Sequence, residues 1–112
     1  MANKPKKGDV GTIIELDMQE DVSSAEAHSE EGTSGIVFIV TKPSGGSEKW
    51  VGVSVYGTNY LRYTVSADEL DEASADYNDT PYLITPKFKL GSWEGHGDTA
   101  KMYVYDTEQP PG

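Results

Sequence analysis

The residues that could carry chemistry gather late in the sequence, between Asp68 and Asp106. Hard cations such as Ca²⁺ bind several oxygen ligands, so a run of carboxylates suggests a calcium site. The run here reads D-E-L-D-E-A-S-A-D-Y-N-D, which does not match the D-x-[DN]-x-[DN]-G pattern of a calcium-binding loop. We therefore favour a solvated corner, at which residues 68–80 cross between two sheets. Its carboxylates are Asp68, Glu69, Asp71, Glu72, Asp76 and Asp79.

The remaining candidates for catalysis are also poorly matched to any reaction. His28 and His96 lie in separate stretches, with no third ligand at the spacing of a metal site. Two carboxylates can hydrolyse a glycoside, but nothing selects a pair among the nineteen acidic residues. The glycines of G-S-W-E-G-H-G-D (91–98) lie between predicted strands and do not open a helix, which excludes a dinucleotide site. The sequence therefore predicts no enzyme, no cofactor and no metal.

Aromatic side chains are a second group with functional potential. The chain has seven tyrosines and two tryptophans. Several tyrosines fall near strand ends or on outward positions, and Trp93 falls in a predicted open loop. Such residues favour a subunit contact, since aromatic side chains are enriched at protein interfaces. Cross-strand packing and a platform for a sugar are the alternatives. The tyrosines near strand ends or on outward positions are Tyr56, Tyr60, Tyr103 and Tyr105.

Composition limits the class of partner. The chain has 112 residues, enough for one domain, and a formal net charge of −10. Nucleic acid is excluded as a partner because the only basic cluster is Lys4, Lys6 and Lys7 at the N-terminus. There is no cysteine, no apolar signal region and no apolar run longer than residues 36–40. We expect a protein made in the cytoplasm, without disulfides and without a membrane span.

Alternating apolar residues predict an all-β fold. Leu61, Tyr63 and Val65 should face inward, and the apolar residues 35–41 should form a central strand covered on both faces or meeting a partner. Pro86 indicates a bulge or an edge. Residues 68–73 could form one helical turn, and residues 26–35 and 91–98 should be loops, with a helix over 23–31 as a rival. The predicted strands are residues 12–17, 35–41, 50–56, 60–65, 82–90 and 100–105.

These elements predict an immunoglobulin-like Greek-key β-sandwich of six to seven strands, without its disulfide. Residues 12–106 would form the sandwich. Residues 1–11 would form an extended N-terminal arm. Residues 107–112 include two prolines and would form a flexible tail.

Several short sequence pieces, in order, resemble a family of small phage and prophage proteins similar to the N-terminal immunoglobulin-like domain of baseplate upper proteins. A typical member has a K-G-D-x-G-T arm, a D-L-S/T-G-A turn, a K-P-D-G hairpin, a D-L-D-x-A-G-x-Y corner and a G-W-x-G-x-G-D/E loop. The corner departs from this pattern, and either Tyr77 or Tyr82 takes the place of its tyrosine; the strand restart favours Tyr82. The pieces are K-G-D-V-G-T (7–12), D-V-S-S-A (21–25), K-P-S-G (42–45), Y-G-T-N-Y-L-R-Y-T-V (56–65), D-E-L-D-E-A (68–73) and G-S-W-E-G-H-G-D-T (91–99).

The resemblance implies a virion structural protein, made in the host bacterial cytoplasm and bound to other virion proteins and to copies of itself. A tail, baseplate or fibre-attachment component is expected first and a capsid decoration protein next. A carbohydrate-binding module that helps adsorption, with a host-surface glycan as partner, is the alternative of a different class. Contacts are expected from residues 1–11, 91–98 and 107–112, and deleting residues 1–10 should leave a folded monomer that no longer enters particles. The candidate interaction residues are Lys4, Lys6, Lys7, Trp93, His96, Tyr103 and Tyr105.

Overall fold

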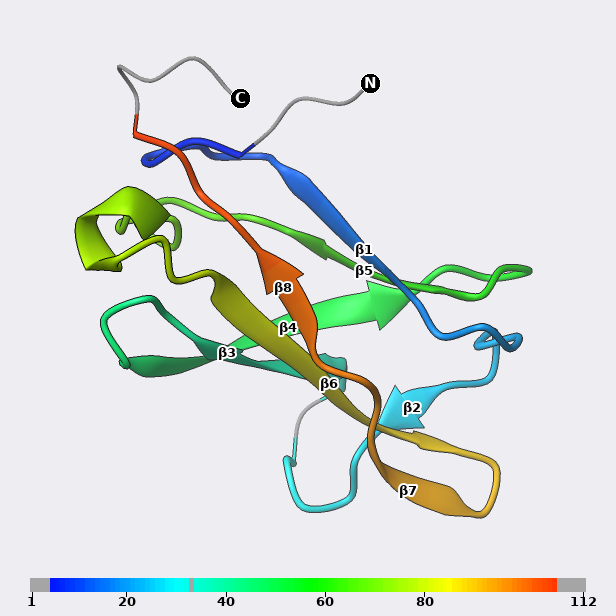
Figure 1. Ribbon diagram of the computed structural model, residues 1–112. Coiled ribbons are helices and arrows are strands. Elements are labelled where there is room, and N and C mark those ends of the chain that lie inside the picture. The colour runs from blue at the N-terminus through cyan, green and yellow to red at the C-terminus, as the bar shows by residue number, and fades with distance from the viewer. Residues whose placement is uncertain (1–4, 33, 107–112) are drawn as a thin grey trace.

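The computed structural model describes residues 5–32 and 34–106, and its strands form one continuous antiparallel arrangement (Figure 1). The strand order is β1-β5-β4-β3-β6, and β2, β7 and β8 also pair with β6. A 3-10 turn, η1, covers Ser74–Tyr77. The strands are β1 (Ile13–Asp17), β2 (Glu26–Ala27), β3 (Ile36–Thr41), β4 (Ser47–Ser54), β5 (Tyr60–Thr64), β6 (Tyr82–Leu90), β7 (Trp93–His96) and β8 (Ala100–Met102).

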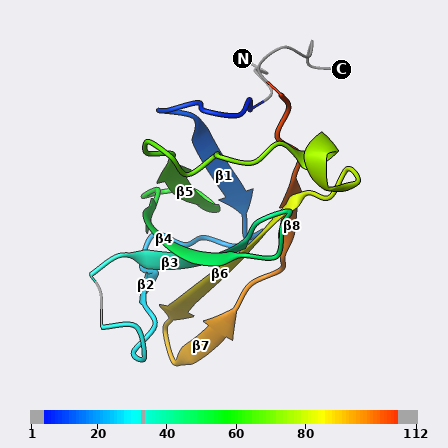
Figure 2. The same cartoon turned by 90° about the vertical axis from the view of Figure 1, so that its left-hand side faces the viewer.

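Strand β4 belongs to two layers. Most of it pairs with β3, while its last two residues pair with β5, as Val53↔Arg62 and Ser54↔Leu61. Figure 2 shows β1 and β5 on one side of the molecule and β3, β6 and β7 on the other. The sheet therefore folds over on itself in a nearly barrel-like way. This confirms the all-β prediction for the described residues.

The core lies between the two layers and is rich in aromatic side chains. The ring of Tyr63 stacks on Trp50, with centroids 5.0 Å apart, and lies 6.1 Å from that of Phe38. Leu61, Tyr63 and Val65 are buried, as their alternation predicts. The buried cluster comprises Ile14, Leu16, Val22, Ile36, Phe38, Val40, Trp50, Leu61, Tyr63, Val65, Leu70, Tyr82, Ile84, Phe88 and Val104.

Strand β4 buries the face that carries Trp50 and exposes the face that carries its valines. Trp50 and Gly52 face the core, whereas Val51 and Val53 are exposed. A Cβ atom at Gly52 would overlap the carbonyl oxygen of Arg62, so glycine permits the close approach of β4 to β5. The large ring of Trp50 on the same face then fills the centre of the core.

The predicted loop over 91–98 and the predicted helical turn over 68–73 are wrong, and the predicted loop over 26–35 holds for its described residues except the first two. Residues 91–98 contain β7, because Gly91, with φ of 63°, turns the chain back so that Trp93 pairs with Leu90. The segment 26–35 begins with β2, which pairs with β6. The helical turn forms at Ser74–Tyr77 and not at 68–73, because Asp68 takes a left-handed φ of 67° that interrupts a right-handed turn.

Pro86 lies in the interior of β6, where the neighbouring edge is interrupted. The carbonyl of Pro86 accepts a hydrogen bond from the Gly97 N–H (2.9 Å), between the residues that form β7 and β8. Because the N and O atoms of one strand residue point to the same side, the missing N–H of Pro86 faces this interruption and not β3. The proline therefore leaves the β3–β6 ladder intact.

Residues 5–11 of the predicted arm lie against their own domain. The Lys7 N–H donates to the Tyr105 carbonyl (2.7 Å), and the Gly8 N–H donates to the Leu70 carbonyl (2.7 Å). The Gly11 N–H donates to the Val65 carbonyl (2.8 Å) at the start of β1. Deleting residues 1–10 would therefore remove main-chain bonds within the domain.

Candidate functional site

A groove of about 420 Å³ lies beside the β6–β7 hairpin, and we call it the Trp93 groove. Trp93 is 45% exposed and meets Phe88 edge-on, with ring centroids 5.1 Å apart. The hairpin brings Trp93 and His96 to the same hollow, although both were assigned to a loop from the sequence. The lining residues are Met18, Glu20, Phe88, Leu90, Trp93, His96, Gly97 and Asp98.

Two glycines shape the Trp93 groove. A Cβ atom at Gly95 would lie 2.9 Å from the indole Cζ2 of Trp93, so the ring lies against the bare backbone of its own strand. A Cβ atom at Gly97 would lie 3.2 Å from the sulfur of Met18, which approaches from the end of β1. The spacing W-x-G-x-G therefore sets the shape of the hollow, and it is the sequence signal that reveals the groove.

The lining chemistry combines an apolar wall with polar groups at its rim. Met18, Leu90 and the rings of Phe88 and Trp93 supply the apolar surface. Glu20 and Asp98 are exposed carboxylates. Such a hollow can bind a ring or an aliphatic side chain against the indole while its polar groups are hydrogen-bonded at the rim. Sequence reasoning missed Met18 and Glu20, because they join the groove only through the pairing of β1 with β5.

Ion pairs hold the loop between β2 and β3 against β4 and β6. Glu31 bridges Lys49 of β4 (2.8 Å) and Lys87 of β6 (2.5 Å), and its side chain is only 6% exposed. Hydrogen bonds from Lys49 and then Lys87 lower the pKa of the Glu31 carboxyl to about 2, although desolvation opposes this. The neighbouring Ser29 N–H donates to the Glu94 carboxylate (2.8 Å). This loop therefore covers the outer face of β3, as the apolar character of that strand requires.

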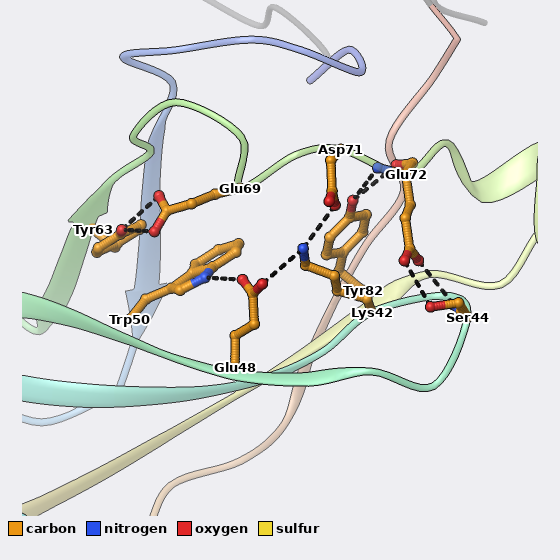
Figure 3. A network of polar contacts seen from close by, with 9 residues as sticks. All are labelled: Lys42, Ser44, Glu48, Trp50, Tyr63, Glu69, Asp71, Glu72 and Tyr82. Atoms are coloured by element: carbon orange, nitrogen blue, oxygen red, sulfur yellow. Dashed lines mark hydrogen bonds and ion pairs between the residues drawn. The ribbon is translucent and has the colours of Figure 1, made fainter.

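The acidic corner is exposed at Asp68, Asp71, Asp76 and Asp79, as the prediction of a solvated corner implies. Three of its six acids, Glu69, Asp71 and Glu72, also make polar contacts within the domain (Figure 3). Lys42, which is 7% exposed, extends its ammonium group to Asp71 (2.7 Å) and Glu48 (2.9 Å). The Trp50 indole N–H donates to Glu48 (3.0 Å). Burial acts to lower the pKa of Lys42, but its hydrogen bonds to Asp71 and Glu48 raise it above the ordinary value. The lysine is thus held charged inside the domain.

Two tyrosines complete the corner. The Tyr82 hydroxyl donates to the Glu72 carbonyl (2.8 Å) and accepts from the Glu72 N–H (3.0 Å), and burial raises the pKa of Tyr82 to about 12. Tyr82 is therefore buried and bonded to the corner, whereas Tyr77 is 38% exposed. The Tyr63 hydroxyl donates to Glu69, and burial together with this carboxylate raises its pKa. The corner is thus a structural anchor in which the K-P-S-G and D-E-L-D-E-A pieces meet.

The structure separates the candidate interaction residues into two places. Trp93 and His96 line the Trp93 groove. Lys6 and Lys7 lie beside Tyr105 at the other end of the strands, where Lys6 and Tyr105 form a parallel bridge. Tyr103 is exposed between β8 and that bridge. Lys4 and the predicted contact residues 107–112 lie outside the described residues.

Comparisons of this chain with known proteins identify no relative. The chain matches no protein-family model, no curated protein and no solved structure. Within residues 5–32 and 34–106, no three histidines, aspartates or glutamates are close enough together to bind a metal ion. That same part of the chain contains no helix with the length and hydropathy needed to cross a bilayer.

Proposed function

We propose that this chain is a non-enzymatic structural protein of a bacteriophage particle, acting through contacts with other virion proteins and with copies of itself. The sequence support is the ordered set of pieces that resembles the immunoglobulin-like domain of baseplate upper proteins. A tail, baseplate or fibre-attachment position is proposed first, and capsid decoration second. The localisation that follows is the virion, after synthesis in the host bacterial cytoplasm.

The strand order supports the finer assignment of the fold. Strands β3, β4 and β5 follow one another through short turns, and β6 returns to lie beside β3. Three consecutive strands with a fourth beside the first is the connectivity of a Greek key. We therefore propose an immunoglobulin-like sandwich whose two layers stay joined through β4.

The observation that carries the proposal is a set of exposed apolar side chains on a strongly acidic chain. Ile13, Val51, Val53 and Tyr60 project from the outward face of β1, β4 and β5, and each is at least 40% exposed. The ion pair of Glu15 with Arg62 lies on the same face beside Val53. Exposed apolar side chains grouped on one face are typical of protein contact sites. We name this set the outer apolar face, and we propose that a neighbouring protein covers it in the particle.

Particle incorporation tests this proposal. Mass spectrometry of purified particles should detect the chain in several copies. A Val53→Asp variant should fold, with an unchanged urea midpoint, yet be depleted from particles because the charge would be buried at a contact. A Tyr77→Asp variant, changed at an exposed side chain at the end of η1, is the matched control and should be incorporated normally. Purified particles without the chain would refute the proposal.

The Trp93 groove favours a second candidate, a carbohydrate-binding module that assists adsorption. An exposed indole beside carboxylates is a suitable surface for a sugar ring and its hydroxyls. A glycan array separates the two functions. Binding that is lost in Trp93→Ala, but kept in Tyr56→Ala at an exposed tyrosine outside the groove lining, would support the module. Absence of binding by the unaltered chain would leave the structural role alone.

A further inference from the structure

The arm residues Pro5–Lys7 are held at the edge beyond β8 by main-chain bonds. The Lys7 N–H donates to the Tyr105 carbonyl (2.7 Å), and the Tyr105 N–H donates to the Pro5 carbonyl (3.0 Å). Lys6 and Tyr105 thus form a parallel bridge. Main-chain bonds of this kind can be made equally by the same segment of another copy, because both copies have the same sequence.

A short hinge joins this arm to β1. Gly8 and Gly11 have left-handed φ values of 89° and 87°, and a Cβ atom at either would meet nothing within 4 Å. Only the backbone conformation, and not a lack of space, therefore favours glycine at these two positions. The Gly11 N–H bonds to the Val65 carbonyl (2.8 Å) and fixes the start of β1, so the bend lies between Gly8 and Gly11. A straighter hinge would direct the arm away from its own domain.

The hinge has an exposed apolar side chain, and the edge has main-chain N–H and C=O groups to which the folded-back arm does not bond. Val10, between the two glycines, is 65% exposed. Ala100 and Met102 pair with Ile84 and Tyr82 of β6. The main-chain N–H and C=O groups of successive residues point to opposite sides of a strand, so those of Lys101 point to the edge away from β6. Those of Tyr105 point to the same edge, where they bond to Pro5 and Lys7. The described residues supply no strand that pairs with Lys101 on that side. An incoming strand could therefore extend the pairing beyond Tyr105 along β8.

From these observations we propose that copies of this chain exchange their arms: residues 5–7 of one copy pair with Tyr105 of the next copy. This inference rests on the proposed function, because it supplies the contact between copies. The bonds broken when the arm leaves its own domain are remade on the neighbour, so exchange costs little free energy beyond association. Because the donor arm and the acceptor edge are different surfaces, repeated exchange is head-to-tail and can close into a ring.

Mixed disulfides provide a direct test, since the chain contains no cysteine. A Lys6→Cys variant and a Tyr105→Cys variant are mixed under mild oxidation. Arm exchange should give the heterodimer in at least about fivefold excess over a control mixture of Lys6→Cys with Tyr56→Cys. Tyr56 is an exposed residue outside the predicted contact and so reports random collisions. Equal yields from the two mixtures would overturn the inference.

Hinge substitutions give an independent measure. Gly8→Ala should favour the straighter, exchanged form and raise the association constant about 5- to 30-fold, because a left-handed alanine costs about 1–2 kcal/mol. Gly57→Ala, at another left-handed glycine with open space around it, should leave association unchanged. Light scattering during size-exclusion chromatography measures both. Monomers of all variants at every concentration would refute arm exchange, whereas detection of the chain in particles would still support the structural function.

Discussion

The buried Lys42 provides the sharpest test of how the corner is stabilised. Its side chain is 7% exposed, whereas those of its partners Glu48 and Asp71 are 40% and 52% exposed. The three charges therefore differ in what happens when a partner is lost. If both carboxylates are neutralised, the cation remains buried without a counter-charge. If the lysine is removed, water can solvate both carboxylates.

These exposures set the expected magnitudes. Glu48→Gln combined with Asp71→Asn should lower the free energy of unfolding by about 3–5 kcal/mol, the usual cost of a buried charge that loses its partners. Lys42→Met keeps the apolar stem and should cost about 1 kcal/mol or less, as for the loss of an exposed ion pair. The glutamine still offers an oxygen to the Trp50 indole N–H, so that hydrogen bond should survive.

Urea denaturation measures the difference. With a slope of about 1–3 kcal/mol per molar urea, the carboxylate double variant should unfold at least about 0.7 M earlier than Lys42→Met. Adding Lys42→Met to the double variant should restore most of the lost stability, because no buried charge would remain. If Lys42→Met proves as destabilising as the double variant, the reasoning from burial is wrong.

Three further changes have defined outcomes. Gly52→Ala should cost about 1–3 kcal/mol or more in urea denaturation because its Cβ would overlap the Arg62 carbonyl oxygen, while Gly46→Ala, with only one ordinary contact at 3.8 Å, should cost far less. Tyr82→Phe should lower stability by about 1–3 kcal/mol, measured in the same way, because both main-chain groups of one residue lose their hydroxyl partner. Glu31→Gln should flatten the acid limb of a stability–pH curve: the folded pKa of about 2 lies below the ordinary 4.5, so this stabilisation is complete above pH 4.5 and disappears as pH falls through about 2. An acid limb unchanged in Glu31→Gln would contradict the ion-pair assignment.

The regular strands were predictable because their alternation is local. The inward positions of Leu61, Tyr63 and Val65 follow directly from period-two burial. The polarity of β4 was not predictable in this way, because both of its faces carry large apolar residues. Only the approach of Arg62 decides that Gly52 must face inward, and that approach depends on tertiary structure.

The candidate site was predictable in part. The stretch containing Trp93 and His96 could be singled out from its residue types, but its strand depends on the positive φ of Gly91. The ion pair of Asp71 with Lys42 was not predicted, because local sequence cannot show a buried cation. Lys42 lies 29 residues from Asp71 in the chain, so this long-range pairing carries no signal at short spacing.

Strand β4 has a consequence for how the chain folds. Because it pairs with β3 along most of its length and with β5 at its end, neither layer can be completed without it. Pairs such as Ile13↔Thr64 and Glu26↔Lys89 join distant segments, so their formation should be slow, on the order of milliseconds to seconds. We expect the two layers to open together in hydrogen exchange, with the β4 amides among the slowest to exchange. A strand shared by both layers thus makes the domain one cooperative unit.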